Sequence, residues 1–195
     1  MVAPIALASD EALVRRVLAG EVDMFETLIG RYGDTVFRVA SRIVGPSEAE
    51  DVAQDVLLRA FNSLDSFRGD ASFKTWLLRI THNTALNALA RRRALPMDEP
   101  AEERGSPLGA STAERTPAEQ LEARERAERL ESKLLLLRPP HRTVLVLREL
   151  EGLTYDEIAL VTDTPIGSVK GRLHRARDEM VEILRNNTYD WDLPR

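Results

Sequence analysis

Apolar residues recur every three or four positions along much of this chain, which is the spacing of one face of an α-helix. Over residues 10–44 this spacing predicts core-facing positions at Leu13, Val14, Val17, Leu18, Phe25, Leu28, Ile29, Tyr32, Val36, Val39, Ala40, Ile43 and Val44. The run Gly45-Pro46-Ser47 interrupts the pattern, and Ser47 is the predicted N-cap of a helix from about Glu48 to Leu64. A loop over 65–71 then leads into a helix from about Phe73 to Arg93. The residues expected to face the core in these last two helices are Val52, Val56, Leu57, Ala60, Phe61, Leu64, Trp76, Leu77, Ile80 and Thr84.

A second group of helices is predicted towards the C-terminus. A charged helix is expected from Pro117 to Leu137, and another from Val144 to Leu150. Thr154 and Glu157 have the spacing of a capping box, in which each side chain accepts a hydrogen bond from the other residue's backbone N–H, so a helix should begin there. Pro165 suits the first turn of one more helix. That last helix is expected to present Val169, Leu173 and Ala176 to the core.

The stretch from Pro96 to Pro117 separates the two groups, because it is rich in Pro, Gly, Ser, Thr, Ala and Glu and contains almost nothing to bury. Such a composition is typical of a flexible linker. We therefore predict an all-α protein with two small helical domains at 1–95 and 118–186, a flexible acidic linker at 96–117 and a C-terminal tail at 187–195.

The composition supports a helical protein and removes several classes of function. Aromatic residues make up only 5% of the 195 residues, which suits helices better than an aromatic-rich sandwich or barrel. The absence of cysteine excludes disulfides, thiolate metal ligands and a cysteine nucleophile. The three histidines lie far apart, and no glycine-rich phosphate loop or nucleophile motif occurs, so we expect no enzyme, cofactor or metal site. No apolar run is long enough to cross a bilayer, and we expect a cytoplasmic protein without membrane insertion.

The charges are distributed unevenly, and this matters more than the formal net charge of −5. Between Arg68 and Arg93 six basic residues stand against one acid, and between Pro165 and Arg177 four basic residues stand against none. Residues 97–131 contain ten acids against five arginines. Two basic patches therefore flank an acidic middle, which is compatible with nucleic-acid binding in spite of the net charge.

The segment from Thr154 to Arg177 reads as a helix, a short turn and a second helix with a basic outer face. This is the helix-turn-helix arrangement, in which the second helix enters the major groove of DNA. An ordinary helical hairpin with a solvated basic face is the alternative, but four basic residues without an acid favour contact with DNA. The residues expected to point outward are Lys170, Arg172, His174, Arg175 and Arg177.

Three stretches together resemble one known family. The run from Phe67 to Thr84, FRGDASFKTWLLRITHNT, resembles the region 2 signature of extracytoplasmic-function sigma factors of the sigma-70 family, as does AEDVAQDV at 49–56. The run LRELEGLTYDEIA at 147–159 is similar to region 4 of the same family. The matches stand in the family's order over nearly all of 10–95 and 118–185, with the linker where the family has one.

The resemblance implies a transcription initiation factor that binds core RNA polymerase and recognises promoter DNA at its −10 and −35 elements. It assigns Asp51, Gln54 and Asp55 to docking on the clamp helices of the β′ subunit, although plain solvation of these polar residues is the alternative. It assigns the helix-turn-helix to the −35 element. The residues that it implies for the melted −10 strand are Arg68, Lys74, Arg79, Asn83 and Asn87.

Further partners follow from the same resemblance. The C-terminal domain is expected to touch the β flap, and an anti-sigma factor is an expected regulator. The arginines at 91–93 are expected to extend the cationic track for the single strand, and Trp76 is expected to be a core residue rather than a base-stacking one. A stand-alone helix-turn-helix regulator is the alternative function, although the second basic patch and the polar face at 51–55 speak against it.

Overall fold

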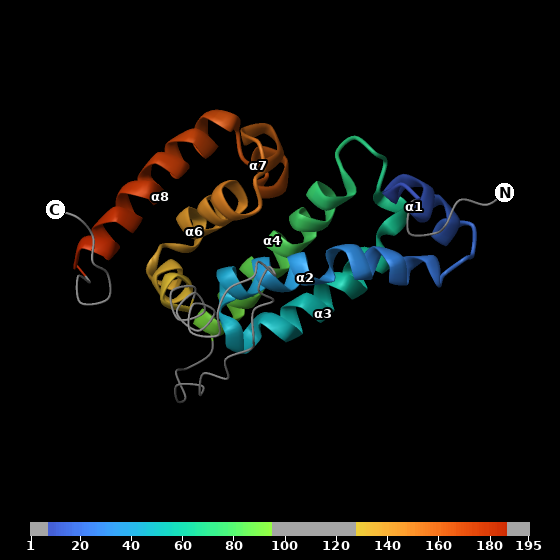
Figure 1. Cartoon of the computed structure of the whole chain (residues 1–195), viewed down its shortest axis with the longest axis horizontal. Helices are drawn as coiled ribbons and strands as arrows, with labels where there is room; N and C mark the ends of the chain where they lie inside the picture. Colours follow the sequence, from blue (N-terminus) through green and yellow to red (C-terminus); the bar gives the residue numbers. More distant parts are fainter. Residues whose placement is uncertain (1–7, 95–127, 187–195) are drawn as a thin grey trace, which may run out of the picture.

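The computed structural model describes residues 8–94 and 128–186, and every regular element in these ranges is helical (Figure 1). This confirms the prediction of an all-α fold. The predicted linker at 96–117 and the tail at 187–195 lie outside the described residues. In chain order the elements are α1 (Asp10–Leu18), α2 (Met24–Val44), α3 (Pro46–Asn62), the short 3-10 helix η2 (Leu64–Ser66), α4 (Phe73–Ala94), a helical stretch at 128–136, α6 (Pro139–Leu145), the π-helical turn η3 (Val146–Leu150), α7 (Tyr155–Thr162) and α8 (Ile166–Asn186).

The N-terminal unit is a bundle in which α2, α3 and α4 pack against one another and α1 covers the start of α2. The predicted apolar stripe of α2 accounts for this packing, since Val36, Val39 and Ile43 are fully buried. The Ser9 side chain caps α1 by accepting a hydrogen bond from the Ala12 N–H at 3.2 Å. Arg31 fixes α1 to α2 through an ion pair with Asp10 at 2.6 Å.

The turn between α2 and α3 differs from the prediction. The helix α3 begins at Pro46, its N-cap is Gly45, and Ser47 is an exposed residue inside the helix, so the expected N-cap at Ser47 was wrong. Gly45 ends α2 and begins α3 at φ 99°, a backbone conformation that only glycine adopts without strain. Proline tolerates the first helical position because it has no N–H to leave unpaired there.

The C-terminal unit confirms the capping box. The Thr154 hydroxyl accepts from the Glu157 N–H at 3.2 Å, and the Glu157 carboxylate accepts from the Thr154 N–H at 2.8 Å. The hydrogen bond from the Thr154 backbone lowers the pKa of Glu157. At the other end of α7, Asp163 takes the left-handed conformation at φ 49°, which lets the chain turn sharply into α8. The helix predicted from Val144 begins earlier, since α6 starts at Pro139.

Three side chains predicted to face the core are exposed instead. Leu18, Ile29 and Phe61 are 53%, 36% and 39% exposed, respectively. Leu18 is the last residue of α1, where no neighbouring helix covers it. Phe61 stands near the end of α3 and keeps only an edge contact with the Phe25 ring, whose centroid lies 5.1 Å away. Helical spacing identifies the side of a helix that is apolar, but it does not determine how far a neighbouring element extends over that side.

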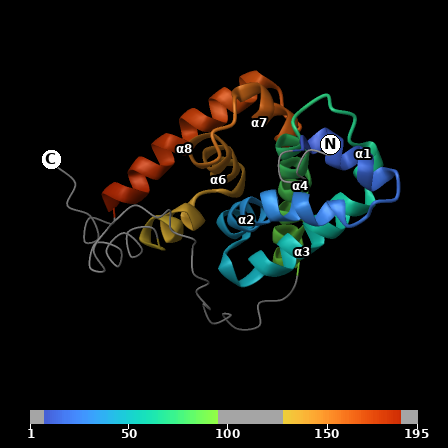
Figure 2. The ribbon, with the colours of Figure 1, turned by 45° about the vertical axis from the view of Figure 1, so that its right-hand side comes forward.

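The two units contact each other directly. Helix α4 packs against α7, and α2 packs against α6 and η3, while α8 packs on α6 and α7 (Figures 1 and 2). Arg142 of α6 is buried at this junction and donates hydrogen bonds to the carbonyl oxygens of Ile43, Leu135 and Leu137 at 2.5, 2.6 and 3.0 Å. Burial lowers the pKa of the Arg142 guanidinium. Three carbonyl acceptors explain how one arginine is accommodated in the interior.

We predict that Thr154→Ala lowers the free energy of unfolding by about 1 kcal/mol, because the substitution removes the cap of α7. Chemical denaturation followed by circular dichroism measures this loss. The control is Thr154→Ser, which keeps a hydroxyl at the same place and should retain most of the stability. Equal stability of the alanine variant and the wild type would show that the capping box does not stabilise the unit.

Candidate nucleic-acid interface

The outer face of α8 carries most of the predicted duplex-binding residues. Lys170, His174, Arg175 and Arg177 are exposed, while the apolar residues Val169, Leu173 and Ala176 are buried on the opposite side, as predicted. The turn between α7 and α8 holds α8 at its N-terminal end, where Ser168 and Val169 donate backbone hydrogen bonds to the Pro165 carbonyl oxygen at 2.8 and 3.1 Å. The apolar and basic residues therefore lie on opposite sides of α8, so that the helix has one basic face.

Arg172 does not follow the prediction that it points outward. It is half-buried, and its guanidinium donates to the Thr164 hydroxyl at 3.1 Å. Thr164 lies in the turn between α7 and α8, so Arg172 braces the turn from within the unit. An arginine side chain is long enough to lie along its own helix, and the sequence pattern does not reveal which direction it takes.

Arg177 is exposed but already paired. Its guanidinium donates to the Glu149 carboxylate at 2.6 Å, and this hydrogen bond raises the pKa of Arg177. His174 lies 3.7 Å from the Asp178 carboxylate, and both side chains are exposed. A DNA phosphate would have to compete with Glu149 for Arg177, whereas Lys170 and Arg175 are exposed without such a pairing to an acid in the contacts seen here.

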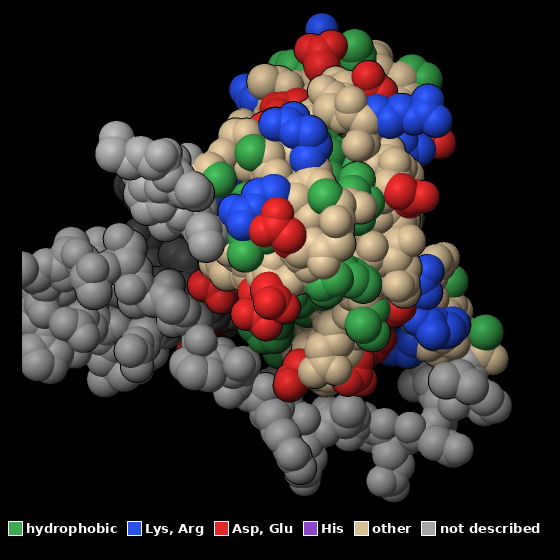
Figure 3. Space-filling model, turned by 90° about the vertical axis from the view of Figure 1, so that its right-hand side faces the viewer, with side chains coloured by type: hydrophobic (Ala, Val, Ile, Leu, Met, Phe, Trp, Pro, Cys, Tyr) green, Lys and Arg blue, Asp and Glu red, His purple; other side chains and the backbone are tan. Residues whose placement is uncertain are grey.

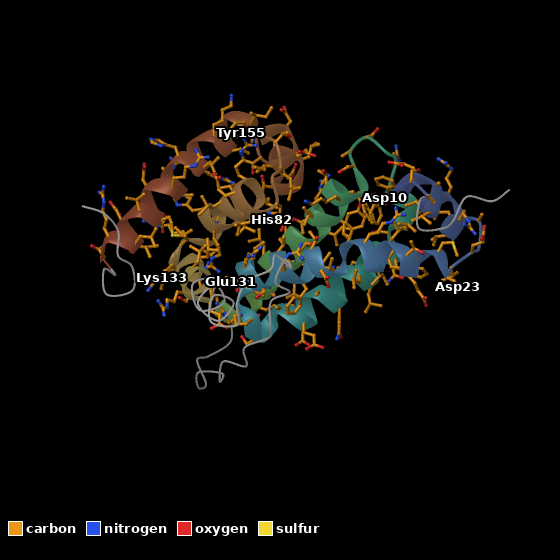
Figure 4. The ribbon with its side chains drawn as sticks, viewed as in Figure 1. Asp10, Asp23, His82, Glu131, Lys133 and Tyr155 are labelled. Carbon is orange, nitrogen blue, oxygen red and sulfur yellow. The ribbon has the colours of Figure 1, made fainter. Side chains whose placement is uncertain are left out.

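An aromatic residue organises part of this basic surface, and the sequence reasoning missed it. The Arg148 guanidinium lies 5.0 Å from the centre of the Tyr155 ring, and the Lys170 ammonium lies 5.6 Å from it. Cations over an aromatic face within about 6 Å are attracted by the ring quadrupole. Tyr155 is the first residue of α7, next to α8 (Figure 4). In the sequence, Tyr155 is visible only as a residue within the capping box. Its contacts with Arg148 and Lys170 become visible only in the folded structure.

A second candidate surface surrounds a cavity of about 510 Å³ between the loop at 67–72 and α4. Arg68, Arg79 and Asn83, all exposed and all predicted for single-strand binding, line this cavity. Asn87 is exposed one helical turn beyond Asn83, outside the cavity lining. Lys74 is half-buried and forms an ion pair with Glu151 of the C-terminal unit at 3.2 Å. The structure therefore brings three of the five predicted residues together around one cavity.

Trp76 packs against the core, as predicted, but it is not fully buried. It is half-buried, and its ring packs against those of Phe67 and Phe73, with centroids 5.7 and 5.4 Å away. Its other side lines the cavity with Arg79 and Asn83. A planar ring held by neighbouring rings and open on one side is suited to stacking with an unstacked base.

The predicted docking residues lie on the outer face of α3. Asp51 and Gln54 are exposed, and Asp55 is half-buried and pairs with Arg59 at 2.8 Å. Leu58, which the sequence analysis did not single out, is 64% exposed one helical turn after Gln54. Towards the end of the molecule where α1 lies, Figure 3 shows hydrophobic side chains among acidic ones. A single exposed leucine is common on protein surfaces, so docking through this face stays a prediction.

The arginines at the end of α4, predicted to extend the single-strand track, lie apart from the cavity that Arg68, Arg79 and Asn83 line. Arg91 and Arg92 line a cavity of about 650 Å³ together with Asp51 and Asp55 of α3. Arg92 also pairs with Glu48 at 3.0 Å. Eighteen residues of α-helix separate Lys74 from Arg92, a rise of about 27 Å, which places them at opposite ends of α4.

His82 is buried on α4 at the junction of the two units (Figure 4). Its Nδ1 has no hydrogen-bond partner among the described residues. Burial lowers the pKa of His82 to about 4, and the nearby Arg172 charge contributes to the same shift. The side chain is therefore neutral at neutral pH, and we assign it no role in DNA binding.

We predict that the protein loses stability as the pH falls from about 6.5 towards 4, because unfolding lets His82 bind a proton that the folded state disfavours. The contribution of the neutral ring is fully present above the pKa of the unfolded chain, and its loss has a limiting slope of about 1.4 kcal/mol per pH unit. Denaturation midpoints measured between pH 7 and 5 test this. His82→Leu should flatten the profile, and the exposed-site control His174→Gln should not; identical slopes for wild type and His82→Leu would contradict the assignment.

No group of histidines, aspartates and glutamates that could hold a metal ion occurs within 8–94 and 128–186. None of the helices in the described part is long and apolar enough to cross a membrane.

Comparisons with known proteins match both helical units. Residues 28–95 match the model of Sigma-70 region 2, and residues 127–180 match that of Sigma-70, region 4. The ECF RNA polymerase sigma-E factor of Haemophilus influenzae is 37% identical over 178 residues, which cover 89% of this chain and 94% of that protein. The sigma-E factor of Escherichia coli strain K12 is 36% identical over 174 residues, covering 87% and 91%.

Two solved structures show the same fold. CnrH, solved in complex with the cytosolic domain of CnrY, superposes with a TM-score of 0.67 at 26% identity, covering 92% of this chain and 99% of CnrH. The sigma factor RpoE of Bartonella quintana, solved with the anti-sigma factor NepR, gives a TM-score of 0.63 at 21% identity, with 84% and 98% covered.

A helical bundle followed by a basic helix-turn-helix defines a promoter-recognition protein of the region 2 and region 4 type. The chain belongs to the sigma-70 family, in its extracytoplasmic-function group. It directs RNA polymerase to promoters and is not an enzyme, as the sequence predicted. A stand-alone regulator would not account for the match to region 2, so that alternative is set aside.

Proposed function

We propose that this sigma factor divides its work among three surfaces: α8 reads the −35 element as duplex DNA, the cavity on α4 holds the melted −10 strand, and the outer face of α3 docks on the β′ clamp helices. The observation that supports this proposal most directly is that the three surfaces are separate from one another in the folded chain. Each has its own charge and exposure, and each lies on a different helix.

The assignment of α8 to the −35 element is supported by its exposed cations. Arg175 and Lys170 can reach guanine edges or phosphates, and a good bidentate base contact contributes about 1–3 kcal/mol of discrimination. Arg177 and His174 are exposed on the same helix and complete the proposed contact set. Arg172 supports this set by bracing the turn at Thr164.

The assignment of the α4 cavity to the −10 strand is supported by its lining. Arg68 and Arg79 supply positive charge for the backbone, Asn83 offers an amide for a base edge, and Trp76 offers a ring for stacking. Sites that bind single strands combine a positively charged groove with aromatic side chains on which bases stack. We propose that Asn87 and Lys74 extend this surface along α4, towards the C-terminal and the N-terminal end of the helix, respectively.

The assignment of α3 to polymerase docking is supported by an exposed polar face with an apolar residue in it. Asp51, Gln54 and Asp55 offer acceptors to a basic partner, and Leu58, one turn further along α3, offers exposed apolar area. We propose that the C-terminal unit makes a second contact, with the β flap.

Regulation by an anti-sigma factor is also proposed. CnrH was solved in complex with the cytosolic domain of CnrY, and the Bartonella quintana RpoE in complex with the anti-sigma factor NepR. This chain has a comparable pair of units for such a partner to hold. We place its activity in the cytoplasm, with polymerase and promoter DNA.

The division between α8 and α3 predicts opposite defects in two variants. Arg175→Ala should weaken −35 recognition by the holoenzyme about tenfold or more, because it removes an exposed cation from α8. Affinity for core polymerase should stay unchanged, because Arg175 is not part of the proposed docking face on α3. Replacing Asp51 and Asp55 by Ala should weaken core binding and leave the −35 preference of any complex that forms. Core affinity is measured with labelled sigma factor, and −35 recognition by comparing promoters with intact and scrambled elements. Loss of both activities in either variant would refute the division.

We predict that Asn83→Ala reduces open-complex formation or changes the −10 preference, since it removes the amide from the cavity wall. Permanganate footprinting of promoter melting by the holoenzyme provides the measurement. The matched control is Asn186→Ala, an exposed asparagine at the end of α8 on the other unit. Normal melting with unchanged −10 preference would remove Asn83 from the site.

A further inference from the structure

The start of α6 obtains a hydrogen bond from α8. Pro139 and Pro140 open α6 and have no N–H, and the side chain of the N-cap residue Arg138 makes no capping hydrogen bond. The Arg138 N–H donates instead to one oxygen of the Glu179 carboxylate at 3.1 Å. A side chain of α8 is therefore the partner of the backbone N–H at the N-cap of α6.

The same carboxylate binds a histidine of α6. The second oxygen of Glu179 lies 2.5 Å from His141 Nδ1, and the side chains of His141 and Glu179 are only 15% and 23% exposed. Although burial opposes the change, the hydrogen bonds from His141 and from the Arg138 N–H lower the pKa of Glu179, so this carboxylate is ionised at neutral pH. An ionised carboxylate only accepts, so His141 Nδ1 carries a proton and donates. We call this contact of Glu179 with His141 and the Arg138 N–H the α6–α8 clamp.

The α6–α8 clamp lies one helical turn from the proposed −35 residue Arg175, because Glu179 follows Arg175 by four positions on the same helix. Two other polar contacts fix α8: Arg172 braces the turn before it, and Arg177 pairs with Glu149 of η3. The clamp adds a third contact, with α6. The orientation of α8 on α6 determines where the Arg175 guanidinium lies, so a contact that fixes this orientation also places the cation.

The clamp contains a group whose charge changes near neutral pH. Histidine is the side chain that titrates between about pH 5 and 8. The other two histidines make no such contact, since His82 is buried on α4 and His174 is exposed beside Asp178 of its own helix. Because Nδ1 of His141 already carries a proton, protonation occurs at Nε2 and turns a neutral hydrogen bond into an ion pair. Charge-assisted hydrogen bonds are roughly twice as strong as neutral ones.

Other charges near the clamp have little influence on it. Arg138 Nε lies 4.0 Å from the Glu179 carboxylate, but the Arg138 side chain is 80% exposed, so this pair contributes little. Arg142, which follows His141 on α6, donates to backbone carbonyl oxygens. The charged residues at the end of α2 and in η3, the elements packed against α6, have other partners; they are Arg42, Arg148 and Glu149. The protonation of His141 therefore decides the net charge of the clamp.

We propose that Glu179 and His141 are positioning residues for −35 recognition: they fix the orientation of α8 on α6, and protonation of His141 strengthens their contact. This inference rests on the proposed role of α8 in reading the −35 element. A recognition helix that is held in place before binding loses less conformational freedom when it binds, so more of the contact energy appears as affinity. The ion pair is present at low pH and is lost as the pH rises, so −35 recognition should weaken in the same direction.

The test measures −35 discrimination, which is the ratio of the affinities of the holoenzyme for promoters with intact and scrambled −35 elements, at about pH 6 and about pH 8. The ratio cancels effects of pH on core binding and on melting. All proteins carry His174→Gln, so that the exposed histidine of α8 does not titrate. On this background, His141→Asn keeps an N–H donor close to the position of Nδ1 without titrating, and Glu179→Gln keeps an acceptor without the charge. The matched control is Glu182→Gln, which removes an exposed carboxylate of α8 outside the clamp.

We expect the discrimination of the His174→Gln background to be about twofold to fivefold greater at the lower pH. His141→Asn and Glu179→Gln should abolish this rise, whereas Glu182→Gln should keep it. A merely structural role would lower the discrimination equally at both pH values and leave the rise in place. A rise in His141→Asn as large as that of the background, or no rise in the background, would overturn the proposal.

Failure of the proposed function has a different signature. If Arg175→Ala leaves −35 recognition unchanged, α8 does not read the −35 element. If Arg175→Ala weakens −35 recognition but the background shows no pH dependence, the role of α8 stands and the positioning role of the clamp is wrong. Far-ultraviolet circular dichroism at both pH values establishes that each variant is folded.

Discussion

Helix α4 is the constraint on which the rest of the structure depends, because it is buried from two directions at once. Leu77, Leu78 and Leu89 meet the N-terminal bundle, and the helix also packs against α7 of the C-terminal unit. Little of its circumference is left for solvent. The exposed residues in its middle, Arg79, Asn83 and Asn87, are spaced four apart and so form one narrow strip along the helix. A strip of this kind can follow an extended strand, but it is too narrow for a broad protein interface.

Because α4 is buried on two sides, the spacing of its apolar residues predicts the helix less clearly than the sequence segments beside it do. Polar residues such as Thr81, His82 and Thr84 are buried on it among apolar ones. Thr81 satisfies its hydroxyl by donating to the Leu77 carbonyl oxygen at 2.9 Å, so it is compatible with the interior. His82 keeps an unpartnered nitrogen and stays neutral instead. Only the three-dimensional packing shows that both sides of the helix are covered.

Much of the fold could be predicted from local signals. The capping box at Thr154 and Glu157, the buried face of α8 and the start of α4 at Phe73 follow from residues close together in the chain, and the structure confirms them. The start of α3 was misplaced because Gly45 and Pro46 together form a turn that needs no Ser cap. Exposure of Phe61 and bracing by Arg172 depend on where neighbouring elements end, which one helix does not reveal.

The residues of the candidate surfaces were likewise predictable where the signal is local in the sequence and not where it depends on distant residues. The exposed residues of α3 and α8 were predictable because exposure follows from the face opposite the apolar stripe. The pairing of Lys74 with Glu151 was not, since the two residues are 77 positions apart and belong to different units. The sequence assigned no role to Glu151 and gave Glu157 only the cap of α7, whereas the structure shows both facing donors of the other unit.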